Sequence, residues 1–175
     1  VKLMVGREIR EMFPRSKRMP GDVVLEVSEL TGPGVLRSAS FELRRSEVLG
    51  IAGLMGAGRT EMVRAIFGLR PVLRGTVRVG MVTGLALPRV RLAQGVGLLS
   101  EDRRDEGLAA SLSVAQNLTL SYLEGVGPFK LLQPRRLDRV SEEWIAKLDI
   151  QCRGPRQRVS ELSGGNQQKV ALARL

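Results

Sequence analysis

One stretch decides the fold class of this chain: Glu47-Val48-Leu49-Gly50-Ile51-Ala52-Gly53-Leu54-Met55-Gly56-Ala57-Gly58-Arg59-Thr60. Its first half is an apolar run typical of a buried strand, and its second half is rich in glycine. Thr60 then opens a segment whose apolar residues have helical spacing. A strand, a glycine-rich loop and a helix in this order form the setting of a phosphate-binding loop. We therefore predict an α/β protein with such a loop.

The glycine-rich part matches most of the pattern G-x-x-x-x-G-K-[ST]. Gly53 and Gly58 take the two glycine positions, and Thr60 takes the final hydroxyl position. Glycine lets backbone N–H groups close around phosphate oxygens, and the helix start adds partial positive charge. Arg59 stands in place of the lysine, and its planar, bulkier fork should crowd the phosphates. The predicted phosphate-binding residues are Gly53, Leu54, Met55, Gly56, Ala57, Gly58, Arg59 and Thr60.

The composition fits an α/β protein that works in a reducing compartment. The chain has 175 residues, enough for one domain with a core, and 43% of them are apolar but only 3% aromatic. Aliphatic side chains must therefore provide most of the packing. Cys152 is the only cysteine, which excludes an internal disulfide framework. No apolar run approaches the ~18 residues of a membrane span, so we expect a soluble chain.

The net charge of +10 raises the question of nucleic acid. The arginines form isolated pairs such as Arg44-Arg45 and Arg135-Arg136 rather than a dense run, and no aromatic residues lie between them for base stacking. We predict a basic surface without a nucleic-acid partner.

Periodicity and turn residues give an outline of the remaining elements. Strands are predicted over residues 23–30, 38–43, 47–52, 76–79 and 95–99, and helices over 6–13, 60–67, 113–120 and 136–148. Gly68 and Ser113 are the expected C-cap and N-cap of two of these helices. The domain boundaries that we expect are a linker over 1–22, a core with the phosphate loop over 23–107, a helical subdomain over 108–158, and a second glycine motif with its helix over 159–175.

That second motif is Ser160-Glu161-Leu162-Ser163-Gly164-Gly165-Asn166-Gln167-Gln168-Lys169-Val170. Ser163 is a good N-cap, and the two glycines after it would admit an anion close to the helix start. Alone, this is the pattern of an ordinary capped helix. It is more specific here, because a phosphate loop lies 103 residues upstream, counted from Thr60 to Ser163, with a helical segment between the two.

Together these motifs resemble the ATP-binding-cassette ATPases. Leu162 to Lys169 is similar to their signature motif, with Asn166 where a glutamine is usual. Met55 to Glu61, Ser100 to Arg103 and the Asn-Gln-Gln-Lys ending of the signature resemble the ATP-binding subunit of simple-sugar importers of the ribose, galactose and xylose type. That subunit carries two cassettes in tandem. The chain resembles the second one, in which an arginine such as Arg59 is usual, and Val5 to Glu8 is similar to the linker between the two cassettes.

The resemblance implies a mechanism in which two cassettes pack head to tail. ATP then lies between the phosphate loop of one cassette and the signature helix of the other, with Mg²⁺ bridging the β- and γ-phosphates. The implied catalytic residues are Ser163, Gly164, Gly165 and Gln167, and the implied Mg²⁺ ligands are Thr60 and Glu101. The implied partners are the N-terminal cassette of the same protein or a second copy, transmembrane permease subunits and, indirectly, a sugar-binding protein. The implied location is the cytoplasmic face of the cell membrane.

Several features depart from the family pattern. No aromatic residue for adenine stacking lies between Val23 and Ser40, and no glutamine follows residues 96–99. Glu101 or Asp102 can replace that glutamine, or their loop is simply a solvated charged segment; both alternatives stay open. The chain stops at Leu175, before the strand in which the family carries an aspartate and a catalytic glutamate. We therefore expect a sheet that is incomplete at the C-terminus and negligible ATP turnover by residues 1–175 alone.

Two further functions compete with the hydrolysing cassette. The first is a nucleotide-binding scaffold that holds ATP at residues 53–60 without hydrolysing it and serves in dimerisation. The second is a P-loop GTPase, which would leave Ser163-Gly164-Gly165 and the helical insertion without a role.

Overall fold

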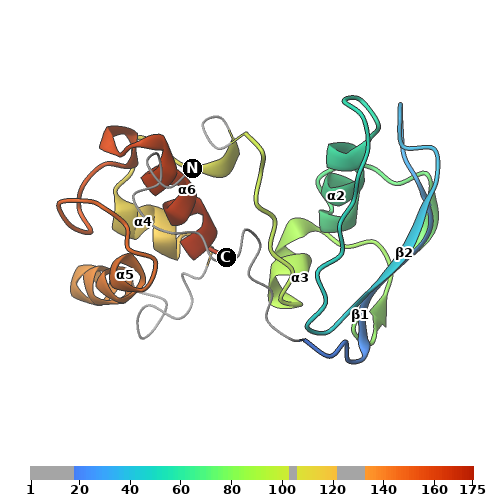
Figure 1. The fold of residues 1–175 in the computed structure, drawn as a ribbon, viewed down its shortest axis with the longest axis horizontal. Helices are drawn as coiled ribbons and strands as arrows, with labels where there is room; N and C mark the ends of the chain where they lie inside the picture. Colours follow the sequence, from blue (N-terminus) through green and yellow to red (C-terminus); the bar gives the residue numbers. More distant parts are fainter. Residues whose placement is uncertain (1–17, 103–105, 122–132) are drawn as a thin grey trace, which may run out of the picture. The chain divides into compact units, whose positions relative to one another are not determined.

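The computed structural model describes residues 18–102, 106–121 and 133–175, which divide into two compact units at residues 85 and 86. Figure 1 shows the described residues in colour. The helix predicted over 6–13, the linker-like residues 5–8, and most of the 1–22 segment lie outside the described residues. No helix in the described ranges is both long and apolar enough to cross a membrane.

The first unit is built on a small antiparallel sheet. Its strands are β1 (Val23–Thr31), β2 (Ala39–Arg44), β3 (Arg74–Val79) and β4 (Val82–Thr83), in the order β2-β1-β3-β4. Val27 pairs with the half-buried Phe41 on one side and with Val77 on the other, and both valines are fully buried. The strands predicted over 23–30, 38–43 and 76–79 are therefore confirmed.

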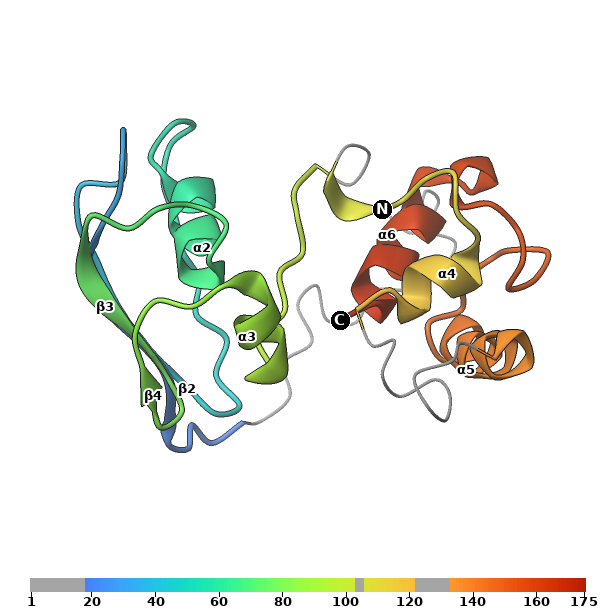
Figure 2. The same cartoon turned by 180° about the vertical axis from the view of Figure 1, so that it is seen from behind.

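One helix of the first unit, α2 (Arg59–Phe67), packs against this sheet (Figure 1 and Figure 2). Its apolar face meets the sheet in one core cluster, made of Val27, Leu30, Leu36, Met62, Ala65, Ile66 and Val77. Gly68 ends the helix with φ of 89°, a left-handed conformation that favours glycine, so the predicted C-cap is confirmed. The packing fixes the helix, and with it the position of the loop that precedes the helix.

Two predicted strands are wrong. Residues 47–52 and 95–99 form no strand, and their apolar side chains are partly in solvent: Val48 is 79% exposed and Leu99 is 45% exposed. A buried strand of this kind needs hydrogen-bonded neighbours at its edges and packed elements over both of its faces. In the part of the first unit that the structure describes, no strand pairs with residues 47–52. Periodicity identifies these apolar runs correctly, but it does not show whether a neighbouring strand pairs with them.

The second unit is helical. It contains α3 (Pro88–Ala93), α4 (Val114–Thr119), α5 (Pro134–Lys147), the short 3₁₀ helix η4 (Val159–Glu161) and α6 (Gly164–Ala173). The predicted helix over 136–148 is confirmed as α5, with a start two residues earlier, at Pro134. Ser113 caps α4 as predicted, and it does so reciprocally: its Oγ accepts from the Gln116 N–H at 3.2 Å, and its own N–H donates to Gln116 Oε1 at 2.9 Å.

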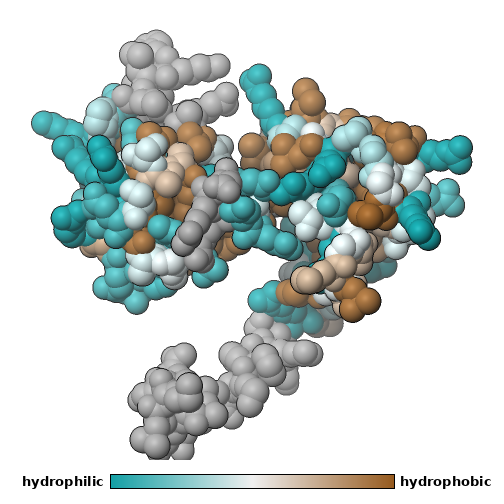
Figure 3. All heavy atoms as spheres, turned by 90° about the horizontal axis from the view of Figure 1, so that it is seen from above, coloured by the Kyte–Doolittle hydropathy of each residue, from teal (hydrophilic) through white to brown (hydrophobic). Residues whose placement is uncertain are grey.

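A single core joins residues of the predicted helical subdomain with residues of the second glycine motif. The members of this cluster are Leu108, Val114, Leu118, Ile150, Val159, Leu162, Val170, Ala171 and Ala173. Trp144 of α5 packs on its edge. Because α6 contributes three of these buried residues, the helix is held by the same core as α4 and η4. The space-filling view shows polar and apolar surface interspersed on the visible face (Figure 3).

Candidate functional site

The predicted phosphate loop leads directly into the start of α2. Gly58 is the N-cap of this helix, with φ of 85°, and no side chain caps the helix there. The first N–H groups of a helix have no partner inside the helix, so they are available to an anion. Residues 51–57 are exposed, and Gly56 also has a left-handed φ of 79°. The loop therefore places exposed backbone directly before a helix, without the strand that the sequence predicts over residues 47–52.

The glycines of this loop meet different surroundings. A Cβ on Gly58 would stand 3.2 Å from Cγ2 of Val35, in addition to the strain of the positive φ. A Cβ on Gly56 would meet nothing within 4 Å. At Gly53 a Cβ would stand 3.1 Å from Cβ of Ala57. Gly58 is thus required both by its positive φ and by the close contact with Val35, whereas Gly56 is required by its positive φ alone.

Arg59, which replaces the lysine of the pattern, folds back over its own loop. Its Cδ lies 3.5 Å from the position that a Cβ on Gly53 would take, so the stem of the side chain crosses that glycine. The side chain is exposed. Leu54 and Met55, at the tip of the loop, are 86% and 97% exposed, and the turn there is closed by a hydrogen bond from the Ala57 N–H to the Leu54 carbonyl at 3.1 Å.

The two predicted metal ligands belong to different units. Thr60 is half-buried in the first turn of α2, and Glu101 is exposed in the second unit. Beside Glu101, the Ser100 hydroxyl donates to Glu106 at 2.7 Å and accepts from the Asp102 N–H at 3.2 Å. Within the described ranges, no group of three or more His, Cys, Asp or Glu side chains could hold a metal ion.

The second glycine motif forms the start of α6. Ser163 occupies the N-cap position, as predicted, but its hydroxyl accepts no hydrogen bond from the helix backbone. It accepts instead from the side-chain amide of Asn166, at 2.9 Å. Ser163 and Gly165 are exposed, and a Cβ on Gly165 would meet nothing within 4 Å. The start of α6 is therefore open to a ligand.

Side chains of α6 form hydrogen bonds that stabilise this helix start. The Gln167 amide donates to the carbonyls of Val159 and Leu162, each at 3.2 Å, and so holds the turn that precedes Ser163. The Asn166 side chain also accepts from the Gln151 N–H at 2.9 Å. Sequence reasoning missed this last contact, because the two residues lie 15 positions apart and belong to no shared motif.

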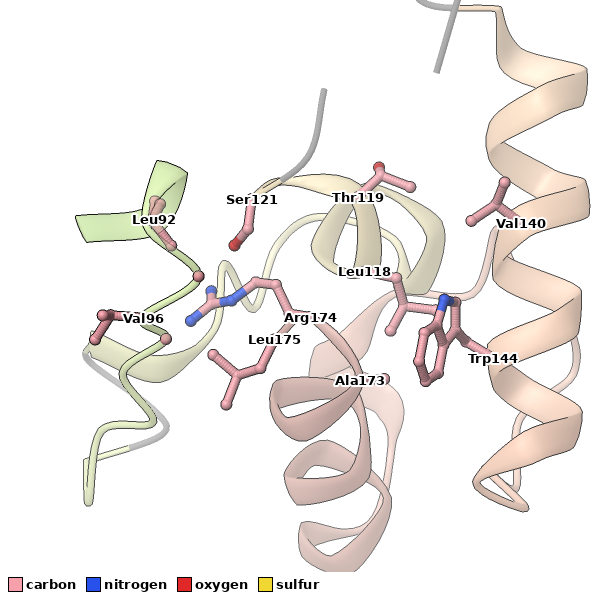
Figure 4. Close-up of a pocket in the computed structure, with 12 residues that line it drawn as sticks. Leu92, Val96, Leu118, Thr119, Ser121, Val140, Trp144, Ala173, Arg174 and Leu175 are labelled. Carbon is pink, nitrogen blue, oxygen red and sulfur yellow. The ribbon is translucent and has the colours of Figure 1, made fainter. Parts of the chain in front are cut away.

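A cavity of about 380 Å³ lies at the other end of α6 (Figure 4). Its walls are mostly apolar, with Leu118 from α4 and Trp144 from α5 on one side. Arg174 reaches into it, and burial lowers the pKa of this guanidinium from its ordinary value. The cavity shares no residue with either glycine motif.

Solved structures with the same fold are ATP-binding cassettes. A nucleotide-free ATP-binding cassette from an ABC transporter matches with a TM-score of 0.69 over 87% of this chain and 64% of its own, at 17% identity. A second cassette of an ABC transporter, in its ADP conformation, matches with a TM-score of 0.64 over the same shares, at 18% identity. The predicted fold class, an α/β P-loop cassette of the ABC ATPase type, is thereby confirmed.

Curated relatives match over nearly the whole chain. Ribose import ATP-binding proteins of Rubrobacter xylanophilus and Halalkalibacterium halodurans are 46% and 40% identical over 99% of this chain. A putative ribose/galactose/methyl galactoside import ATP-binding protein of Burkholderia cenocepacia is 39% identical over the same share. The chain spans about a third of the length of these relatives, namely 35%, 35% and 34%.

The family model described as "ABC transporter" matches residues 36–175. The matched range contains both glycine motifs, from Gly53 to Thr60 and from Ser163 to Gly165, together with α2 and α6. It covers well over half of the chain, and the curated relatives align over 99% of this chain. This chain belongs to the ABC transporter family.

Proposed function

We propose that this chain is the second of two tandem ATP-binding cassettes in an importer of simple sugars, and that it serves hydrolysis chiefly through the start of α6. The names of the curated relatives support ATP-driven sugar import. The observation that carries the proposal is the Ser163 hydroxyl, which is exposed at the start of α6 and caps no N–H of that helix. A serine in this state is free to serve a ligand.

In this proposal the loop at residues 53–60 binds the phosphates of ATP in its own site. Support comes from the left-handed Gly56 and Gly58, which shape the turn into α2 at positions where a Cβ would be strained. Mg²⁺, when bound, neutralises charge on the β- and γ-phosphates. Thr60 would contribute a hydroxyl oxygen, a donor type that suits this hard cation.

Arg59 is proposed to weaken hydrolysis at this loop, although it keeps the positive charge of the lysine that it replaces. A guanidinium is a planar fork, whereas an ammonium is a compact point charge that fits between phosphate oxygens. The stem of Arg59 passes over Gly53, so the side chain lies along the loop. Nucleotide would then be held at residues 53–60 with slow turnover.

The start of α6 is proposed to act on ATP that is held by the loop of the other cassette. The Ser163 hydroxyl and the N–H groups of Gly164 and Gly165 would donate to the γ-phosphate, assisted by the partial positive charge of the helix end. Catalysis of phosphoryl transfer consists mostly of such positioning and charge stabilisation. Gln167 would contribute through the turn that it holds by its bonds to Val159 and Leu162.

The proposed partners follow from the proposed role as a cassette of a sugar importer. They are the N-terminal cassette of the same protein or a second copy, permease subunits in the membrane and, through them, a sugar-binding protein. The proposed location is the cytoplasmic face of the membrane. The names of the relatives support a transporter context with permease partners, since each is an import ATP-binding protein.

The alternative is a scaffold that binds nucleotide at residues 53–60 and contributes nothing to hydrolysis. Arg59 in the lysine position is the observation that favours it. The two functions differ in what they require of Ser163, because only the first function needs that hydroxyl during turnover.

The test uses the full-length, two-cassette protein and measures steady-state ATP hydrolysis. Ser163→Arg should abolish turnover, because the longer side chain fills the space that the γ-phosphate would take. Arg59→Ala should change the rate little. Ser160→Arg, the same replacement at an exposed serine three positions earlier, is the matched control and should stay near the parent rate. Retention of turnover by Ser163→Arg would make the scaffold the better description.

A further inference from the structure

We propose that Asn166 is a positioning residue for the Ser163 hydroxyl: it makes Ser163 Oγ an acceptor, so that the hydroxyl proton is left for a phosphate oxygen. The inference rests on the proposed role of Ser163 and adds to it the residue that sets the direction of its proton. It is carried by two hydrogen bonds that the Asn166 amide makes at the start of α6.

The first step is the orientation of the amide. The backbone N–H of Gln151 can only donate, so the Asn166 atom that faces it at 2.9 Å must be the oxygen, Oδ1. The other end of the amide is then the nitrogen, Nδ2, which faces Ser163 Oγ at 2.9 Å. The hydrogen-bond network thus fixes which end of Asn166 meets the serine.

The second step concerns the proton of the serine. A hydroxyl has one proton to donate and two lone pairs that accept. Asn166 occupies one lone pair, and in the part of the chain that the structure describes the Ser163 hydroxyl donates to no group. Its proton therefore remains available at an exposed position. Accepting a bond also polarises the hydroxyl and strengthens the bond that it donates, most of all to a charged oxygen.

The third step is the rigidity of the support. Gln151 follows Ile150, which is 4% exposed and belongs to the core of the second unit. The preceding residue, Asp149, is bonded through its carbonyl to the Lys169 ammonium of α6. The backbone that orients Asn166 is thus attached to the core on one side and to α6 on the other, so the amide is held in place before any ligand arrives.

The experiment compares Asn166→Asp and Asn166→Ala in the full-length, two-cassette protein, with kcat and KM for MgATP as the readout. Asn166→Asp keeps the acceptor for Gln151 but replaces the N–H donor by a carboxylate oxygen. That oxygen would accept a hydrogen bond from the Ser163 hydroxyl, so the proton would no longer point to a phosphate. Asn166→Ala removes both bonds and leaves that proton free to turn. We expect kcat to fall on the order of tenfold to a hundredfold in Asn166→Asp, less in Asn166→Ala, with KM within about threefold of the parent in both.

A merely structural role predicts the opposite order, because Asn166→Ala loses more contacts than Asn166→Asp. A greater loss of kcat in Asn166→Ala would therefore overturn the inference. Gln168→Glu adds the same negative charge two residues along α6, at an exposed side chain, and is the matched control for charge alone. A comparable loss of kcat in Gln168→Glu would also overturn it.

The background Ser163→Ala separates this inference from the proposed function. If Asn166 acts through the serine, Asn166→Asp should cost less than about threefold once Ser163 is alanine. An undiminished loss of kcat in that background overturns the positioning role while leaving the role of Ser163 intact. If Ser163→Ala alone leaves kcat unchanged, the proposed function of the serine fails, and this inference fails with it.

Discussion

The starts of α2 and α6 both place glycine next to an exposed helix end, but they are built by different means. At α2 the shape comes from the backbone: Gly56 and Gly58 adopt left-handed conformations, and no side chain caps the helix. At α6 the shape comes from side chains: Asn166 bonds to the Ser163 hydroxyl, and Gln167 bonds to the turn before it. The start of α2 should therefore lose its shape when a Cβ is added to a glycine, and the start of α6 when a side-chain donor is removed.

The difference also bears on the roles proposed for the two sites. A loop of exposed backbone donors can close around several phosphate oxygens, which suits binding. A hydroxyl that is oriented beforehand by an amide suits a single oxygen at which charge develops during a reaction, because no reorganisation is then needed. We therefore expect changes at α2 to alter mainly affinity for nucleotide, and changes at α6 to alter mainly turnover.

The largest effect is expected from Gly58→Ala. The new Cβ must accept a φ of 85° and a contact of 3.2 Å with Val35, so we expect a loss of about 2 to 3 kcal/mol in stability. Nucleotide affinity should fall at least about tenfold, since the same backbone forms the phosphate loop. Chemical denaturation and titration with a fluorescent ATP analogue measure the two effects.

Gly56→Ala is the control for this change, because it has a similar φ of 79° but open space around the new Cβ. It should cost only about 1 kcal/mol, the strain of the conformation alone. Equal losses in the two variants would contradict the view that the Val35 contact makes Gly58 the more demanding position.

A smaller effect is expected from Gln167→Met, which keeps the length of the side chain but removes its N–H donor. The carbonyls of Val159 and Leu162 lose this donor, at a cost of about 1 to 2 kcal/mol. The start of α6 should loosen, so kcat should fall together with the unfolding temperature. A loss of kcat with unchanged unfolding would instead indicate that Gln167 contacts the nucleotide directly.

The features of the molecule that depend on neighbouring residues could be predicted from the sequence. Three helix ends depend on local residues: Gly68, Ser113 and Ser163 each act within a few residues of themselves, and the sequence predicts each at the end of a helix where the structure has it. The apolar faces of α2 and α5 follow the helical period for the same reason.

What could not be predicted is non-local. Spacing predicts strands at the apolar runs 47–52 and 95–99, but strand formation depends on a neighbour that spacing does not reveal. The partner of the Ser163 hydroxyl could not be predicted either, because an N-cap serine ordinarily accepts from its own helix. Its actual partner, Asn166, is itself oriented by Gln151, and this pairing exists only once α5 and α6 share a core.

The smallest effect is expected at the contact of Lys169 with Asp149, and it tests how far side chains determine the start of α6. The ammonium donates to the Asp149 carbonyl and lies 3.8 Å from Oδ2 of the carboxylate, whose side chain is 82% exposed. Exposed ion pairs contribute little because water and salt screen them, so Lys169→Met should cost about 0.5 kcal/mol and less at high salt. Denaturation at two salt concentrations measures this cost. Turnover of the full-length protein should stay within about twofold, since Asn166 and Gln167 still hold Ser163; a tenfold loss would mean that the ion pair, rather than the two amides, positions the serine.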